Sequence, residues 1–117
     1  MTRLITGATG FVGSNLDGDY KVSSADANLV NFEETKRLLF EYQPETVIHA
    51  AGRHGNYAQI NDDKVSYYRD NALISINIFE AARLCGVLNM VAFSSVTAFP
   101  DQIDYFSEQD LYQGEPH

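Results

Sequence analysis

Hydrophobic and polar positions alternate along this chain in blocks that predict strands and helices in turn. Short apolar runs at residues 4–6, 20–24, 46–51 and 90–94 predict buried or half-buried strands. Apolar residues spaced three or four positions apart predict helices at residues 32–42 and 65–85, and a shorter helix at 11–16. The long helix is indicated by a stripe made of Tyr68, Ala72, Ile76, Phe79 and Ala82 after Val65.

Residues that favour helix ends support two of these boundaries. Asn31 is a predicted N-cap, and Glu34 three residues later completes a capping-box pattern. Pro44 stops this helix, and Gly86 stops the long one. The first of the two is expected to turn four side chains inward: Phe32, Leu38, Leu39 and Tyr42.

Strands that alternate with helices predict an α/β fold, a Rossmann-type doubly wound parallel sheet that is truncated after about the fifth strand. We assign residues 1–100 to this unit and residues 101–117 to a surface loop or tail, because the latter hold five acids and no lysine or arginine. Ligands bind such sheets where the strands end. The residues expected at that edge are Thr6, Ser24, Ala51, Ser94 and Ser95.

The glycines of the run from Thr6 to Gly13 suit a phosphate-binding turn between a strand and a helix. Gly7 allows a sharp turn, Gly10 lets backbone amides approach a phosphate, and Gly13 lets the helix pack closely. The helix N-terminus is then expected to face the phosphate. A glycine-rich loop without a ligand is the alternative for this motif taken alone.

The composition of the chain limits the classes of partner, the cell compartment and the metal sites that we expect. Sixteen acidic and eight basic residues give a net charge of −8, which argues against nucleic acid as a partner. The one cysteine, Cys85, excludes a disulfide within the chain, and no apolar run is long enough to span a membrane, so we expect a cytoplasmic protein. No histidine, cysteine and carboxylate cluster has the spacing of a metal site.

Three ordered motifs resemble those of the extended short-chain dehydrogenases/reductases, the NAD-dependent epimerase/dehydratase family. They are the glycine run, the segment from His49 to Gly52, and the segment from Phe93 to Pro100. Within that family, three parts are most similar to GDP-L-fucose synthases: residues 23–42, the serine strand at residues 94–100, and residues 107–117. The resemblance covers essentially the whole chain.

The resemblance implies a nucleotide-sugar reductase or epimerase that uses NADP(H) or NAD(H), with a GDP-sugar as the favoured substrate. It implies that Ser95 polarises the oxygen of a keto sugar and that Val96 and Thr97 lie near this sugar. No arginine follows the second predicted strand, so the choice of cofactor stays open, although Ser23 and Ser24 offer hydrogen bonds to a phosphate. The implied cofactor-binding residues are Gly7, Thr9, Gly10, Phe11, Val12, Gly13, Ser24, Asp26, Asn28, Ala50, Ala51, Gly52, Asn71 and Ser94.

One family feature is missing from these 117 residues. The family's catalytic Tyr-x-x-x-Lys pair has no match, since no tyrosine here has a lysine four positions later. A tyrosine without a positive neighbour is a poor acid or base at neutral pH, so we expect this chain not to turn over substrate alone. The alternatives are a non-catalytic dinucleotide-binding fragment, an enzyme completed by a second polypeptide, or another family activity such as a UDP-sugar 4-epimerase or dehydratase.

Other polar residues have structural interpretations beside functional ones. His54 is more typical of a solvated loop residue than of a base, and His49 is expected to pack within the sheet. Cys85 is interpreted as a small apolar group rather than a nucleophile. We also expect self-association, as a homodimer or otherwise, through the helix at 65–85 or an exposed sheet edge.

Overall fold

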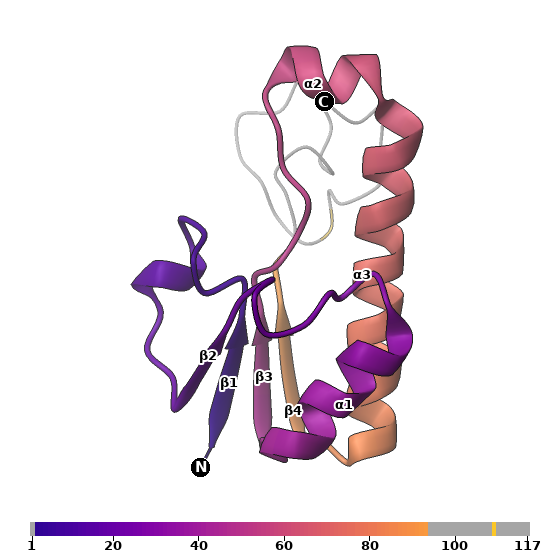
Figure 1. The fold of residues 1–117 in the computed structure, drawn as a ribbon. Helices are drawn as coiled ribbons and strands as arrows, with labels where there is room; N and C mark the ends of the chain where they lie inside the picture. The colour runs from indigo at the N-terminus through magenta and orange to yellow at the C-terminus, as the bar shows by residue number, and fades with distance from the viewer. Residues whose placement is uncertain (1, 94–108, 110–117) are drawn as a thin grey trace.

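The structure, a computed structural model, describes residues 2–93 and residue 109. Within them, four parallel strands form one sheet in the order β2-β1-β3-β4, which confirms the predicted α/β class. Figure 1 shows the sheet with the two longer helices beside it. The elements in chain order are β1 (Arg3–Thr6), a 3-10 helix η1 (Gly13–Asn15), β2 (Tyr20–Val22), α1 (Phe32–Tyr42), β3 (Thr46–His49), α2 (Tyr57–Asp62), α3 (Lys64–Cys85) and β4 (Asn89–Ala92).

The hydrophobic core lies between the sheet and the pair α1 and α3, which lie on the same face (Figure 1). Leu4 of β1 pairs in register with Val47 of β3, and Val47 with Met90 of β4, so one row of side chains crosses the sheet. This row packs against residues of both helices: Leu38, Leu39, Ile78, Ala81 and Ala82. Burial of this apolar surface fixes both helices against the sheet.

Helix α1 begins and ends where the sequence predicts, but with one different contact. Asn31 Oδ1 accepts a hydrogen bond from the Glu34 N–H at 3.0 Å, which confirms the N-cap. The Glu34 carboxylate accepts from the N–H of Asn28 at 3.2 Å instead of returning to Asn31. The predicted capping box is therefore only half formed, because the preceding loop brings a closer donor.

Helix α3 has the predicted length but a different buried face. Gly86, with φ of 77°, ends it as expected. The stripe that indicated the helix is largely exposed, with Val65, Tyr68 and Ile76 at 78%, 79% and 63%. The buried positions are Ile74, Asn77, Ile78, Ala81 and Ala82. Because apolar residues occur on two faces of this helix, their spacing predicts a helix without identifying the face that meets the core.

The predicted helix at residues 11–16 is wrong in extent, since only Gly13–Asn15 form a 3-10 turn. Leu16 already has extended backbone, and the Asp19 N–H bonds to the Arg3 carbonyl oxygen at 3.0 Å, which directs the chain into β2. Residues 16–19 therefore belong to the return to β2 and do not extend the helix. Helix α2, in contrast, was not predicted, although Asn56 and Gln59 form a complete capping box at its start. No helix in the described residues is long and apolar enough to cross a membrane.

Candidate functional site

The glycine loop after β1 packs directly on the end of β3. Gly7 has φ of 70°, and a Cβ there would lie 2.6 Å from the Ala50 carbonyl oxygen. A Cβ on Gly13 would lie 2.0 Å from the Gly7 carbonyl oxygen. Gly10 is less crowded, with its nearest atom at 3.3 Å. Gly7 and Gly13 therefore have no room for a side chain, and Gly13 packs against the loop itself rather than the strand.

The loop leaves backbone donors available at its tip. The N–H groups of Phe11 and Val12 make no hydrogen bond within the described residues, and both side chains are exposed. The nearby amides of Gly10 and Ser14 are used, on the carbonyls of Gly7 and Gly10. Since η1 has only three residues, its dipole is small, and the expected phosphate-facing helix end is replaced by these free loop amides.

A buried hydrogen-bond network joins the ends of β1 and β3. The Thr6 hydroxyl oxygen accepts from the N–H groups of Ala50 and Ala51, both at 3.2 Å, and lies 2.7 Å from Nδ1 of His49. Because it accepts from two N–H groups, it donates its own proton to Nδ1, which places the imidazole proton on Nε2. Burial lowers the pKa of His49, so the ring is neutral, and it packs within the sheet as predicted.

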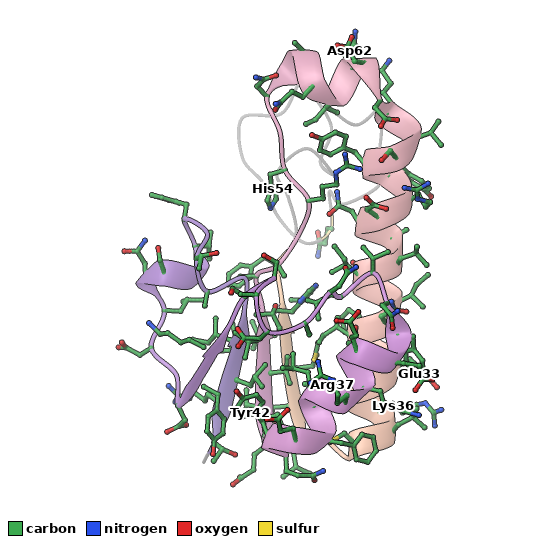
Figure 2. The ribbon with its side chains drawn as sticks, in the orientation of Figure 1. Glu33, Lys36, Arg37, Tyr42, His54 and Asp62 are labelled. Carbon is green, nitrogen blue, oxygen red and sulfur yellow. The ribbon has the colours of Figure 1, made fainter. Side chains whose placement is uncertain are left out.

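A cavity of about 510 Å³ opens at the ends of β3 and β4. It brings together four residues that the sequence assigned to the cofactor, namely Val12, Ala50, Ala51 and Asn71, and also His54. Figure 2 shows His54 on the stretch between β3 and α2, away from α3. His54 also borders a smaller hollow of about 270 Å³ with Gly10, Phe11, Val12 and Ala50. Its side chain thus lies between the glycine loop and the larger cavity.

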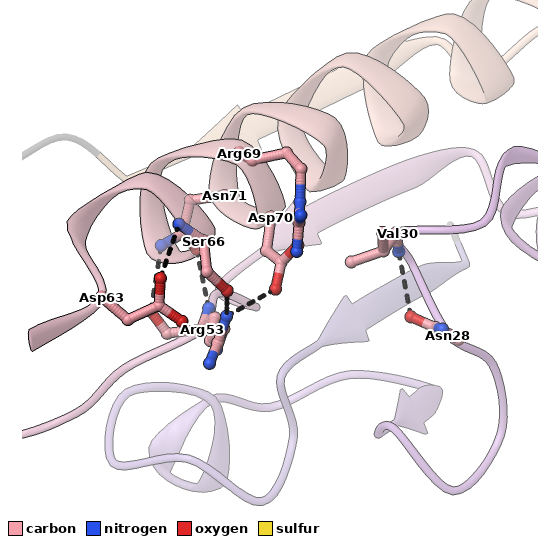
Figure 3. Close-up of polar contacts among 8 residues, drawn as sticks. All are labelled: Asn28, Val30, Arg53, Asp63, Ser66, Arg69, Asp70 and Asn71. Carbon is pink, nitrogen blue, oxygen red and sulfur yellow. Dashed lines mark hydrogen bonds and ion pairs between the residues drawn. The ribbon is translucent and has the colours of Figure 1, made fainter. Parts of the chain in front are cut away.

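Side chains of α3 hold the stretch that follows β3. Asn71 accepts a hydrogen bond from the Arg53 N–H at 2.7 Å and donates one to the Arg53 carbonyl oxygen at 3.0 Å. The Arg53 guanidinium donates to Ser66 and, at 2.8 Å, to Asp70 (Figure 3). It also stacks on the Tyr67 ring, 4.0 Å from the ring centroid. We call this set, Arg53, Ser66, Tyr67, Asp70 and Asn71, the α3 latch.

The contacts of the α3 latch are absent from the sequence interpretation, which assigned only Asn71 of this set to the site. Loss of hydration acts to raise the pKa of Asp70, but hydrogen bonds and positive charges of Arg69 and Arg53 outweigh it and lower that pKa. The spacing of Asp70 and Asn71 gives no sign of a partner 17 or 18 residues earlier. The signal that the sequence offered was Gly52 and Gly55, since glycines mark places where another part of the chain comes close. A Cβ on Gly55 would lie 2.5 Å from the Tyr67 hydroxyl of α3.

The loop after β2 places the residues assigned to the adenosine side of a cofactor. Ser24, Asp26 and Asn28 are exposed there. Asp26 Oδ2 accepts from the Ser23 N–H at 2.8 Å, and Asn28 Oδ1 accepts from the Val30 N–H at 3.1 Å (Figure 3 shows the latter). Although no arginine follows β2 in the sequence, Arg37 of α1 donates to the Asp26 carbonyl oxygen at 3.3 Å.

Several predicted site residues lie outside the described residues: Ser94, Ser95, Val96 and Thr97. Cys85 is partly buried and donates to the Leu39 carbonyl oxygen at 3.2 Å, and burial raises the pKa of its thiol. A thiol of this kind is a poor nucleophile. Among the described residues, no three histidine, cysteine, aspartate or glutamate side chains are grouped to hold a metal ion.

Residues 3–117 match the family model described as the NAD dependent epimerase/dehydratase family. The chain is similar to a probable GDP-L-fucose synthase of Drosophila melanogaster, at 31% identity over 97% of this chain and 39% of that protein. It is 29% identical to a GDP-L-fucose synthase of Dictyostelium discoideum, over 99% of this chain and 40% of that protein. A crystal structure of a GDP-L-fucose synthetase from Naegleria fowleri bound to NADP superposes with a TM-score of 0.78, at 31% identity over 98% of this chain and 37% of that chain.

The chain spans about two fifths of the length of these relatives. Its glycine loop, the ends of β1 and β3, and α3 all lie within the matched residues.

Proposed function

Because the chain belongs to the NAD dependent epimerase/dehydratase family, we propose that residues 1–117 form the cofactor-binding part of a nucleotide-sugar reductase or epimerase of the GDP-L-fucose synthase type. The observation that carries this proposal is the glycine loop. It is pressed against the end of β3 at Gly7, and it presents the free N–H groups of Phe11 and Val12 beside a cavity of about 510 Å³. Free amides in a glycine-rich turn suit the pyrophosphate of NADP(H) or NAD(H).

The cofactor, when bound, supplies the hydride for reduction of a keto sugar. The Phe11 and Val12 amides would hold the phosphates of the cofactor. The small residues Ala50, Ala51 and Gly52 would let its adenosine side pass close to the backbone after β3. Asn71 acts here through Arg53, because its side chain holds that backbone, so we assign it a positioning role rather than a cofactor contact. Thr9 is exposed at the loop and keeps its assignment as a cofactor contact.

A GDP-sugar is the substrate that we favour. Support comes from the relatives, which carry the names GDP-L-fucose synthase and GDP-L-fucose synthetase. In this proposal, Ser95 hydrogen-bonds the reacting oxygen, and Val96 and Thr97 contact the sugar. A UDP-sugar 4-epimerase or a dehydratase is the near alternative, because these family activities share the serine strand. A cytoplasmic location stays a prediction from composition.

Titration of the purified 117-residue chain with NADPH and with NADH by calorimetry tests the proposal. We expect one site per chain for at least one of the two dinucleotides. Gly10→Asp should weaken that binding, since it places a negative charge beside the Phe11 and Val12 amides, at a position where a Cβ lies 3.3 Å from the Gly7 carbonyl oxygen. Gly86→Asp, at a glycine with nothing within 4 Å, is the charge-matched control. Absence of binding by the unmodified, folded chain would contradict the proposal.

Turnover separates an enzyme from a binding fragment. Oxidation of NADPH or NADH in the presence of GDP-4-keto-6-deoxymannose, followed by absorbance, would remove the non-catalytic alternative if the purified chain supports it. Without turnover, a pull-down from native extract would reveal a completing polypeptide. If that pull-down recovered homomeric species alone, the split enzyme would be excluded.

Self-association through α3 is our proposal for the assembly. Val65, Tyr68, Ile76 and Phe79 leave an apolar strip exposed on this helix, with Ile76 at 63%. Light scattering of the wild-type chain should show a dimer, and Ile76→Arg should shift it to a monomer. Leu88→Arg, at a residue 74% exposed beyond the helix, should leave the dimer intact. A wild-type monomer at high concentration would rule this assembly out.

A further inference from the structure

Asn77 is a buried polar residue of α3. Its side chain is only 7% exposed, and it lies next in sequence to the fully buried Ile78. Its Nδ2 atom donates hydrogen bonds to the carbonyl oxygens of Leu29 and Val30, at 2.8 Å and 3.0 Å. A buried carboxamide without partners would destabilise the fold, so these two hydrogen bonds account for the presence of Asn77 at this position.

The two carbonyl groups belong to the loop between β2 and α1, residues 23–31. Figure 1 shows the chain crossing from β2 toward α3 before α1 begins. The other hydrogen bonds of this loop are made within it or by α1, which follows it directly. Thr35 of α1, for example, donates to the Leu29 carbonyl oxygen at 3.3 Å. In the described part of the chain, the hydrogen bonds that reach residues 23–31 from beyond α1 are those of Asn77.

These hydrogen bonds join residues that are 47 and 48 positions apart, so they fix the loop in a different way from local contacts. Local hydrogen bonds shape the loop, whereas those of Asn77 join it to a helix that the hydrophobic core holds against the sheet. The same helix holds the stretch after β3 through Asn71, six residues earlier. Two carboxamides of α3 therefore hold two separate segments at the ligand-binding edge of the sheet.

The loop after the second strand is where a Rossmann-type fold receives the adenosine ribose of a dinucleotide. Ser24, Asp26 and Asn28, which are assigned to the adenosine side of the cofactor, are exposed on this loop. The two carbonyl groups that follow them in sequence accept hydrogen bonds from α3 instead. From this division we propose that Asn77 is a positioning residue for the adenosine half of the cofactor, which acts by fixing the backbone of the loop. This role presupposes the dinucleotide binding proposed above.

Calorimetric titration of the full 117-residue chain tests this role with two ligands, 5′-AMP and whichever of NADPH and NADH binds more tightly. Asn77→Ala should raise both Kd values by similar factors of about 3- to 30-fold, because both ligands require the same ordered loop. Asn61→Ala is the matched control, since the Asn61 side chain is exposed and makes no hydrogen bond in the described residues. It should leave both Kd values within about twofold of the wild type.

Hydrogen exchange gives a readout that a general loss of stability would not produce. In Asn77→Ala, the amides of residues 24–31 should exchange faster, while those of β1, β3 and the stretch after β3 keep their wild-type rates. In the wild type, 5′-AMP should slow exchange in residues 24–31. If circular dichroism shows that Asn77→Ala does not fold, Asn77→Ser replaces it. Serine keeps one hydroxyl donor at this position, so both Kd values should rise by a smaller factor.

The outcomes separate this role of Asn77 from the proposed function. If the folded wild-type chain binds neither dinucleotide, the proposed function itself fails. If the wild type binds but a folded Asn77 variant keeps both Kd values, or if Asn61→Ala weakens binding as much, Asn77 does not position the cofactor while dinucleotide binding stands. The same conclusion follows if 5′-AMP leaves exchange in residues 24–31 of the wild type unchanged, or if Asn77→Ala raises exchange along the whole chain.

Discussion

Two loops meet at the same edge of the sheet, but different contacts hold them in place. The glycine loop after β1 is fixed by main-chain packing, because Gly7 and Gly13 leave no space between its backbone and that of neighbouring residues. The stretch after β3 is fixed by side chains of α3, through the Asn71 hydrogen bonds and the stacked Arg53 guanidinium. The glycine loop therefore depends on residues without a side chain, and the stretch after β3 depends on particular side chains that are distant in sequence.

This difference determines what each loop can tolerate. At Gly7 and Gly13 the backbone contacts leave no space for even one methyl group, so substitutions at these two positions should cause steric clashes. A loop held by hydrogen bonds should lose stability in steps, one per contact removed. The predictions below test this contrast, beginning with the largest expected effect.

Gly13→Ala should be the most damaging single change. Its Cβ would lie 2.0 Å from the Gly7 carbonyl oxygen, so backbone must move, and we expect a loss of about 3 kcal/mol or more in the free energy of unfolding. Gly86→Ala is the comparison, because its φ of 77° strains any side chain there but no atom lies within 4 Å of the added Cβ. It should cost only about 1–2 kcal/mol. Urea unfolding measures both, and equal losses would show that the glycine loop is not sterically fixed.

Asn71→Ala should have the next largest effect. It leaves the Arg53 N–H and carbonyl without their partners, and a buried polar group left unpaired costs about 1–3 kcal/mol. Hydrogen exchange should rise in residues 52–56 and stay unchanged in the glycine loop. Ser75→Ala, one turn further along α3 at a side chain with no hydrogen bond in the described residues, should change stability by less than about 0.5 kcal/mol. Faster exchange in both loops would mean that they are not held separately.

The same contrast explains how much of the fold the sequence predicts. The strands, α1 and α3 follow from local patterns, since Asn31, Gly86 and the apolar runs act on adjacent residues. The face that α3 buries does not follow, because Ile76 and Ile78 look alike in sequence and only packing against α1 and the sheet separates them. The first helix was overpredicted because the early return to β2 depends on Asp19 bonding to Arg3.

For the site, the sequence predicts what depends on glycine or on a motif. Gly7, Gly13, Ala50 and Ala51 lie together as expected, because a close approach of backbones requires small residues. The α3 latch could not be predicted from spacing, because the Arg53 and Asp70 pair is formed by the return of the chain along α3. The contact of Arg37 to the Asp26 carbonyl oxygen could not be predicted from spacing either, since it joins residues 11 positions apart.

Acidification should weaken the hydrogen-bond network of Thr6 and His49 at the ends of β1 and β3, where both loops begin. Burial lowers the pKa of His49 in the folded chain below the value of 6.5 that it has in the unfolded chain. At a pH between the folded and the unfolded pKa, the unfolded chain therefore binds more protons than the folded one. Stability should therefore be full above about pH 6.5 and fall as the pH drops below it, by at most about 1.4 kcal/mol per pH unit. Urea unfolding from pH 8 to pH 5 should show this slope in the wild type. His49→Asn should flatten it, and an equal slope in both proteins would assign the effect to other groups.

Arg53→Lys should give the smallest effect and shows which part of the α3 latch matters most. Lysine keeps the positive charge near Asp70 but loses the stacking on Tyr67, worth about 0.5–1 kcal/mol at a partly exposed site. Arg69→Lys, at a side chain 62% exposed that also reaches Asp70, should cost almost nothing. Urea unfolding compares the two with Asn71→Ala. A loss for Arg53→Lys as large as that for Asn71→Ala would mean that the guanidinium, and not the amide, holds the stretch after β3.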